Sequence, residues 1–148
     1  MTYQLQQKLF KDLSIRIPYG VMVEYHNKAY ELCSIGCPYG FINYYMGLIT
    51  VSIKNGNEVI SNIPFDEVKP YLYELCLDDK IRKDMCDDLG LPIRIHSIGD
   101  PYLYSGEDDT LFNWRKIINW LYEHHYDVYG LIDDGIGIKI TEENNPYK

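Results

Sequence analysis

Apolar residues recur at helical spacing in one long stretch near the C-terminal end of the chain. Within residues 108–125, spacings of three and four positions give one apolar stripe, formed by Leu111, Trp114, Ile117, Ile118 and Leu121. Asp and Thr residues at 108–110 supply side-chain oxygens where a helix leaves free N–H groups, and His124 and His125 follow at the opposite end. The pattern predicts a helix that ends near the two histidines.

Alternation of apolar and polar positions predicts strands on both sides of this helix. After it, the isoleucines of residues 136–140 alternate with Gly137 and Lys139, which is typical of a short strand with one apolar face. Before it, residues 20–63 divide into alternating and β-branched segments, and Asn55-Gly56 is the clearest hairpin turn. These segments predict a curved antiparallel β-meander, with a partial barrel as the more closed alternative.

Weaker patterns predict the remaining elements. Residues 4–13 carry apolar side chains on one helical face, and residues 78–89 read as a helix closed by Gly90. Residues 64–68 start a helical turn that Pro70 stops or kinks, and residues 92–98 alternate as a further strand. Residues 141–148 are polar, so we expect a frayed tail.

Together these patterns predict an α+β fold in one domain over residues 1–148. The curved meander packs with two to three helices and a short C-terminal strand. Its expected parts are the β-meander at 20–63, a helical half with the C-terminal strand at 64–140, and the tail at 141–148.

The charge of the chain is concentrated in its second half. The formal net charge is −8; residues 1–74 hold seven acids against six bases, and the remainder holds fifteen against eight. Such a chain lacks the basic surface expected of a nucleic-acid binder and should avoid anionic membranes. The first residues lack the apolar core of a secretory signal, so we expect a cytoplasmic protein with reduced cysteines.

No motif in the sequence is complete enough to predict a metal or a cofactor. Cys33 and Cys37 have no second pair at zinc-site spacing, and they are better interpreted as small buried side chains. Gly135-x-Gly137 is too short for a dinucleotide fingerprint. The paired aspartates at 78–79, 87–88 and 108–109 lie at predicted helix ends and are interpreted as caps. We therefore expect no metal and no cofactor.

The most reactive cluster in the sequence is His124, His125 and Asp127. A carboxylate beside an imidazole can orient it as a general base, which would suit a small hydrolase or a small-ligand-binding protein. No nucleophile motif accompanies the cluster, so no catalytic residue is assigned. The structural interpretation is a charged helix end in which Asp127 accepts N–H groups of the following turn. Trp120 is the better candidate of the two tryptophans for an exposed contact.

The chain resembles a group of small proteins of gut bacteria, their phages and mobile elements, to which no activity is assigned. The resemblance rests on IPYGVMVEY at 17–25, DEVKPYL at 66–72 and NWLYEHHYDVYGLIDDGIGIKI at 119–140. It implies a shared fold and no particular chemistry. The matching residues are mostly turn and core types: Pro18, Tyr19, Gly20, Val68, Lys69, Pro70, Tyr71, Leu72, Trp120, Leu121, Asp127, Gly130, Leu131 and Ile132.

These observations favour a non-enzymatic accessory or interaction protein. Its expected partner is a protein, and in the more specific form of the hypothesis a basic protein, bound through the acidic C-terminal half. No direct contact with nucleic acid or membrane is expected. One specific form is a phage- or mobile-element-borne inhibitor of a basic nucleic-acid-handling enzyme. The candidate partner-binding residues are Asp84, Asp87, Asp88, Trp120, His124, His125 and Asp127. The oligomeric state is left open.

Overall fold

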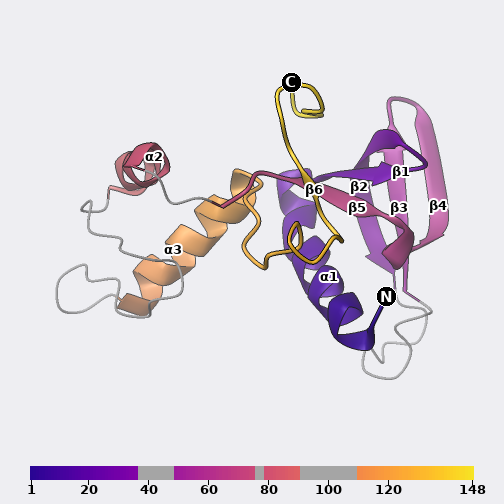
Figure 1. Cartoon of the computed structure of the whole chain (residues 1–148), viewed down its shortest axis with the longest axis horizontal. Coiled ribbons are helices and arrows are strands. Elements are labelled where there is room, and N and C mark those ends of the chain that lie inside the picture. The colour runs from indigo at the N-terminus through magenta and orange to yellow at the C-terminus, as the bar shows by residue number, and fades with distance from the viewer. Residues whose placement is uncertain (37–48, 76–78, 91–109) are drawn as a thin grey trace.

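The computed structural model describes residues 1–36, 49–75, 79–90 and 110–148 (Figure 1). Within these ranges the helices are α1 (Tyr3–Arg16), α2 (Asp79–Leu89) and α3 (Thr110–Glu123), with short 3-10 turns η1 (Ile17–Tyr19) and η3 (Phe65–Glu67). The strands are β1 (Met22–Tyr25), β2 (Lys28–Gly36), β3 (Thr50–Asn55), β4 (Glu58–Pro64), β5 (Lys69–Leu72) and β6 (Ile138–Lys139).

The strands form one curved, open sheet in the order β4-β3-β2-β1-β5-β6. All neighbouring strands are antiparallel except β5 and β6, which run parallel. Tight turns join β1 to β2 and β3 to β4, and φ is positive at His26, Asn27 and Gly56, as such hairpins require. The predicted α+β class is confirmed, and the sheet does not close into a barrel.

Helix α1 covers the sheet and forms the larger core with it. Thr2 caps the helix by accepting the Leu5 N–H at 3.4 Å. Leu9 and Leu13 are fully buried against strand residues such as Val23 and Ile53. Burying each of these aliphatic side chains contributes about 1.5–3 kcal/mol. The predicted helix at 4–13 is confirmed, and it continues to Arg16.

Helices α2 and α3 form a second, smaller core. Met85 and Cys86 of α2 pack with Ile117 and Leu121 of α3, and all four side chains are buried. In Figure 1, α1 lies between the sheet and this helical pair. The helices predicted at 78–89 and within 108–125 are both present, as Asp79–Leu89 and Thr110–Glu123. Residues 78, 108 and 109 of these predictions lie outside the described residues.

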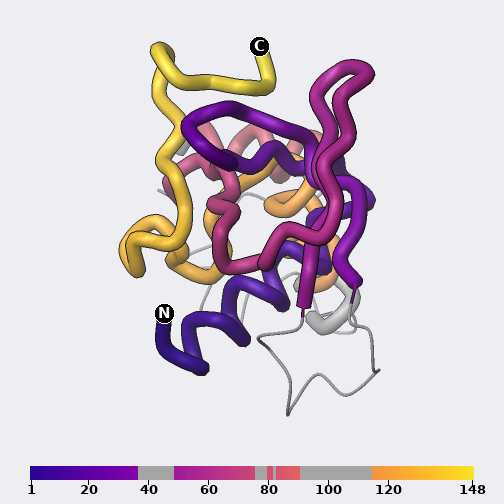
Figure 2. The backbone as a smooth tube through the Cα atoms, turned by 90° about the vertical axis from the view of Figure 1, so that its right-hand side faces the viewer, coloured from indigo at the N-terminus to yellow at the C-terminus, as the bar shows by residue number. Residues whose placement is uncertain are grey.

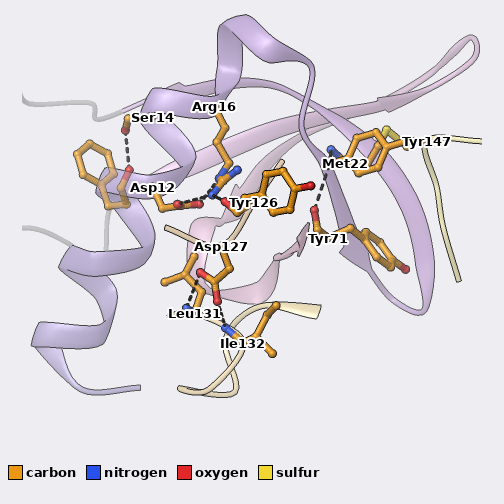
Figure 3. Close-up of polar contacts among 11 residues, drawn as sticks. Asp12, Ser14, Arg16, Met22, Tyr71, Tyr126, Asp127, Leu131, Ile132 and Tyr147 are labelled. Carbon is orange, nitrogen blue, oxygen red and sulfur yellow. Dashed lines mark hydrogen bonds and ion pairs between the residues drawn. The ribbon is translucent and has the colours of Figure 1, made fainter. Parts of the chain in front are cut away.

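A buried ion pair connects the two cores. The Arg16 and Asp12 side chains are fully buried, and the guanidinium makes two hydrogen bonds to the carboxylate, at 2.6 and 2.9 Å (Figure 3). Arg16 also donates to the Tyr126 carbonyl at 2.6 Å and lies 4.7 Å from the centre of the Tyr122 ring. Burial raises the pKa of Asp12 above its ordinary value, and Arg16 opposes part of this rise.

Strand β5 was not expected from the sequence. Pro70 suggested the end of a helical turn, whereas only Phe65–Glu67 are helical and Lys69–Leu72 form an interior strand. Proline is uncommon in an interior strand because it cannot donate a ladder hydrogen bond. Here β5 pairs with β1 over only two positions, Val23 with Pro70 and Glu24 with Lys69.

Part of the expected structure lies outside the described residues. This applies to the strand at 92–98 and to residues 37–48 of the expected β-meander, which include Cys37. The C-terminal strand is present but short, since β6 covers only Ile138–Lys139 of the expected 136–140.

The polar composition of residues 141–148 predicts fraying, yet these residues make specific contacts. Asn144 accepts the Thr141 N–H at 2.7 Å, and Asn145 donates to the Tyr73 hydroxyl at 2.8 Å. The Tyr147 hydroxyl accepts the Met22 N–H at 3.0 Å and donates to the Tyr71 carbonyl at 3.1 Å. We call residues 141–148 the C-terminal strap; Figure 2 shows it running along the outside of the molecule.

Candidate functional site

A groove lies between the C-terminal half of α2 and the end of α3. It has a volume of about 360 Å³ and is lined by Asp84, Asp87, Asp88, Trp120, His124 and Tyr126, which together define the acidic groove. This volume lies within the range of natural ligand and side-chain pockets. Five of the seven partner-binding residues expected from the sequence therefore lie together, although they come from helices about thirty positions apart in sequence.

The spacing of the three aspartates explains why they share one face. Asp84, Asp87 and Asp88 are related as i, i+3 and i+4, positions that lie about 5–6 Å apart on a helix surface. Met85 and Cys86 point into the smaller core instead. The same packing that joins α2 to α3 thus directs three carboxylates toward Trp120 of α3 and toward the two rings that follow the helix.

The aromatic wall of the groove is an ordered set of rings. The Trp120 Nε1–H donates to the Asp88 Oδ2 at 2.8 Å. The indole stacks with His124 at 4.0 Å and with Tyr126 at 5.8 Å between ring centres. The His124 Nδ1 donates to the Trp120 carbonyl at 2.8 Å, which fixes the imidazole beside the indole. Asp88 and Trp120 therefore hold the two helices in register at the groove.

The expectation that Trp120 is exposed is wrong. Only 5% of the residue is accessible, because α2 packs over the indole and leaves it on the wall of the groove. A tryptophan can bury its ring and still present its N–H to a polar partner. Tyr126 was not among the expected site residues, because it follows the helix and no periodic pattern includes it.

The helix-cap interpretation of Asp87 and Asp88 is also wrong. Acidic caps are favourable at a helix N-terminus, whereas these residues lie in the last turn of α2, next to the negative end of the helix dipole. Asp88 is compensated by Trp120, and its Oδ2 lies 3.9 Å from the His124 Nε2. Among the described residues, Asp84 and Asp87 make no hydrogen bond or ion pair. The groove thus carries negative charge that local structure does not require.

His125 and Asp127 do not line this groove. The His125 ring stacks on Tyr147 of the C-terminal strap, with 4.0 Å between ring centres. The Asp127 carboxylate accepts the N–H groups of Leu131 and Ile132 at 2.8 and 2.9 Å (Figure 3). Asp127 thus stabilises the turn, as the structural interpretation predicts. His124, His125 and Asp127 do not form one centre.

The Cys86 thiol on α2 is a further reactive group close to the groove. Burial and the neighbouring Asp87 raise the pKa of the Cys86 thiol, which keeps it protonated and poorly nucleophilic. Over the described ranges, no three His, Cys, Asp or Glu side chains are grouped to hold a metal ion. None of the helices described is long and apolar enough to cross a membrane.

The groove can therefore attract a cationic group. Two carboxylates without a partner among the described residues supply the charge, and the packed rings supply a rigid wall. Comparison of the chain with protein-family models, with curated proteins and with solved structures found no match.

Proposed function

We propose that this protein is a non-enzymatic, cytoplasmic interaction protein that binds a basic protein partner through the acidic groove. The observation that carries the proposal is the pair Asp84 and Asp87, two carboxylates that have no partner among the described residues and lie on the rim of a groove whose opposite wall is aromatic. Aromatic residues that exclude water beside a charge are typical of the centres of protein interfaces.

The position of these carboxylates supports a role in binding. Like charges at i, i+3 spacing repel each other by about 0.2–0.5 kcal/mol, and an acid in the last helical turn costs about 0.3–1 kcal/mol more. A structural role would place compensating cations there. A cationic side chain of a partner would supply this compensation on binding.

The chemistry of the groove suggests one class of partner. Enzymes that handle nucleic acids present clustered Lys and Arg side chains to bind phosphates. Three carboxylates on one helical face offer such a cluster an alternative anionic surface. Inhibition of a basic nucleic-acid-handling enzyme is therefore the most specific form of the proposal.

Affinity capture from host lysate tests the proposal. We expect the wild-type chain to capture a basic protein at about 0.05 M salt and to lose it at about 0.5 M, because screening weakens exposed charge pairs. The variant Asp84→Asn/Asp87→Asn should capture much less. The matched control Glu58→Gln/Glu143→Gln removes the same charge from exposed sites outside the groove and should capture as the wild type does. Equal capture by both double variants would contradict the role of the groove.

A further inference from the structure

The C-terminal strap is held at a defined position between two strands. In the register of β1 and β5, Val23 faces Pro70, so the next pair would be Met22 and Tyr71. The Tyr147 hydroxyl instead bridges these two residues, accepting from the Met22 N–H and donating to the Tyr71 carbonyl. The side chain therefore replaces a ladder contact, and the strap closes the end of the β1–β5 pairing.

His125 holds the ring of Tyr147 from the other side. The two rings are nearly parallel, with an angle of 9° and 4.0 Å between their centres. His125 follows α3 with φ at 61°, its N–H donates to the Tyr122 carbonyl, and the next N–H, of Tyr126, donates to the Leu121 carbonyl. This is a Schellman-type helix end, in which glycine is the usual residue at the positive-φ position.

The presence of histidine at this position has a cost. A residue with a side chain is strained at positive φ, and such strain persists only where the surrounding structure fixes the conformation. The contact that His125 makes is the stack with Tyr147. The strained position therefore points to a use of the imidazole ring, because glycine would serve the helix end better.

Protonation would make the His125 ring unfavourable where it lies. Its Nδ1 is buried and has no hydrogen-bond partner among the described residues, so a proton there would lack an acceptor. Burial, then the charge of Arg16 on α1, then neighbouring His124 lower the pKa of His125 to about 4. The face of the Tyr147 ring would attract a protonated imidazole, but this attraction is smaller than the combined effect of burial and of repulsion by Arg16 and His124.

The groups around Tyr147 do not offset the cost of protonating His125. Burial raises the pKa of Tyr147 to about 12, so the hydroxyl stays neutral and keeps both hydrogen bonds at any moderate pH. Arg16 is already paired with Asp12, and the Tyr73 hydroxyl accepts a hydrogen bond from Asn145 of the strap. The imidazole is therefore the group of this contact whose pKa differs between the two forms, about 4 when the stack is closed and the ordinary 6.5 when it is open.

We propose that the His125–Tyr147 stack is a pH-dependent contact that keeps the C-terminal strap closed at neutral pH and releases it when His125 takes a proton. The closed form binds fewer protons than the open form between pH 6.5 and about 4, so opening increases as the pH falls through this range. Release would expose the Met22 N–H and the Tyr71 carbonyl.

Hydrogen exchange of the Met22 N–H in the full chain tests this proposal. After correction for intrinsic exchange, we expect opening to rise by roughly tenfold or more between about pH 7.5 and about pH 5. Most carboxylates remain ionised over this interval. The Leu32 N–H, which donates to the Val21 carbonyl, reports on the sheet alone and should keep its protection.

Two variants separate the stack from backbone strain. His125→Gly relieves the strain, so a purely structural role predicts a tighter strap; we expect faster Met22 exchange at neutral pH and no dependence on pH. His26→Gly is the matched control, because His26 also has positive φ and stacks on a tyrosine, Tyr25, but lies in the β1–β2 turn. The Met22 N–H of His26→Gly should exchange as it does in the wild type at both pH values.

Three results would overturn the proposal. One is Met22 exchange that changes by less than about twofold between the two pH values. Another is an equal increase of Met22 exchange at low pH in His125→Gly. The third is an equal increase of exchange at the Leu32 N–H, which would mean global unfolding.

Discussion

Replacement of Asp12 by alanine is expected to lower the free energy of unfolding by about 3–5 kcal/mol. Asp12 and Arg16 are both fully buried, and two hydrogen bonds join them. Removing the carboxylate leaves a buried guanidinium whose one remaining hydrogen-bond partner among the described residues is the Tyr126 carbonyl. Urea unfolding followed by circular dichroism measures the loss.

The double variant Asp12→Leu/Arg16→Met keeps this prediction testable if the single variant unfolds. Replacing both charges by apolar groups of similar volume removes the uncompensated charge, so we expect at least half of the lost stability to return. The Tyr126 carbonyl would still lose its partner, which accounts for incomplete recovery. A double variant that is less stable than Asp12→Ala would show that the ion pair is not the source of the effect.

Neutralising the two rim carboxylates is expected to change binding and stability in opposite directions. In Asp84→Asn/Asp87→Asn we expect affinity for the captured partner to fall by roughly tenfold to a hundredfold, because close pairs of opposite charge across an interface can be strongly coupled. The same variant should gain about 0.5–1 kcal/mol of stability, since repulsion within α2 and with its dipole is relieved.

A loss of affinity together with a gain of stability distinguishes a role of these carboxylates in binding from a role in supporting the fold. A variant that loses binding because its helix is damaged would lose stability as well. Thermal unfolding of the purified variant beside Glu58→Gln/Glu143→Gln provides the comparison. A clear decrease in stability for the groove variant would indicate that Asp84 and Asp87 support α2, and the proposed function would then lose its main support.

The sequence is sufficient to predict the elements that have a strong local pattern. The apolar stripe around Ile117 and Leu121 predicts α3, and Asn55-Gly56 predicts the β3–β4 hairpin, because both signals depend on neighbours in the chain. β5 has no such signal: it is four residues long, contains Pro70, and is a strand only because β1 and β6 lie on either side of it. The bridging hydroxyl of Tyr147 is likewise invisible before the chain folds.

The candidate site is predictable only in part, for a related reason. The three aspartates and Trp120 could be proposed as partner-binding residues from charge and residue type, but their convergence depends on the pairing of α2 with α3. His124 and His125 are adjacent in sequence yet face different surroundings, because His125 occupies the positive-φ position where the helix ends. The His–Asp cluster of the sequence therefore separates in the fold.

The most direct test of the acidic groove is a calorimetric titration of the captured partner into the purified chain over a series of salt concentrations. We predict binding that weakens as salt increases, with a shallower salt dependence and lower affinity in Asp84→Asn/Asp87→Asn and near-wild-type values in Glu58→Gln/Glu143→Gln. Identical affinities and salt dependences for the two double variants would show that overall charge, and not the groove, attracts the partner.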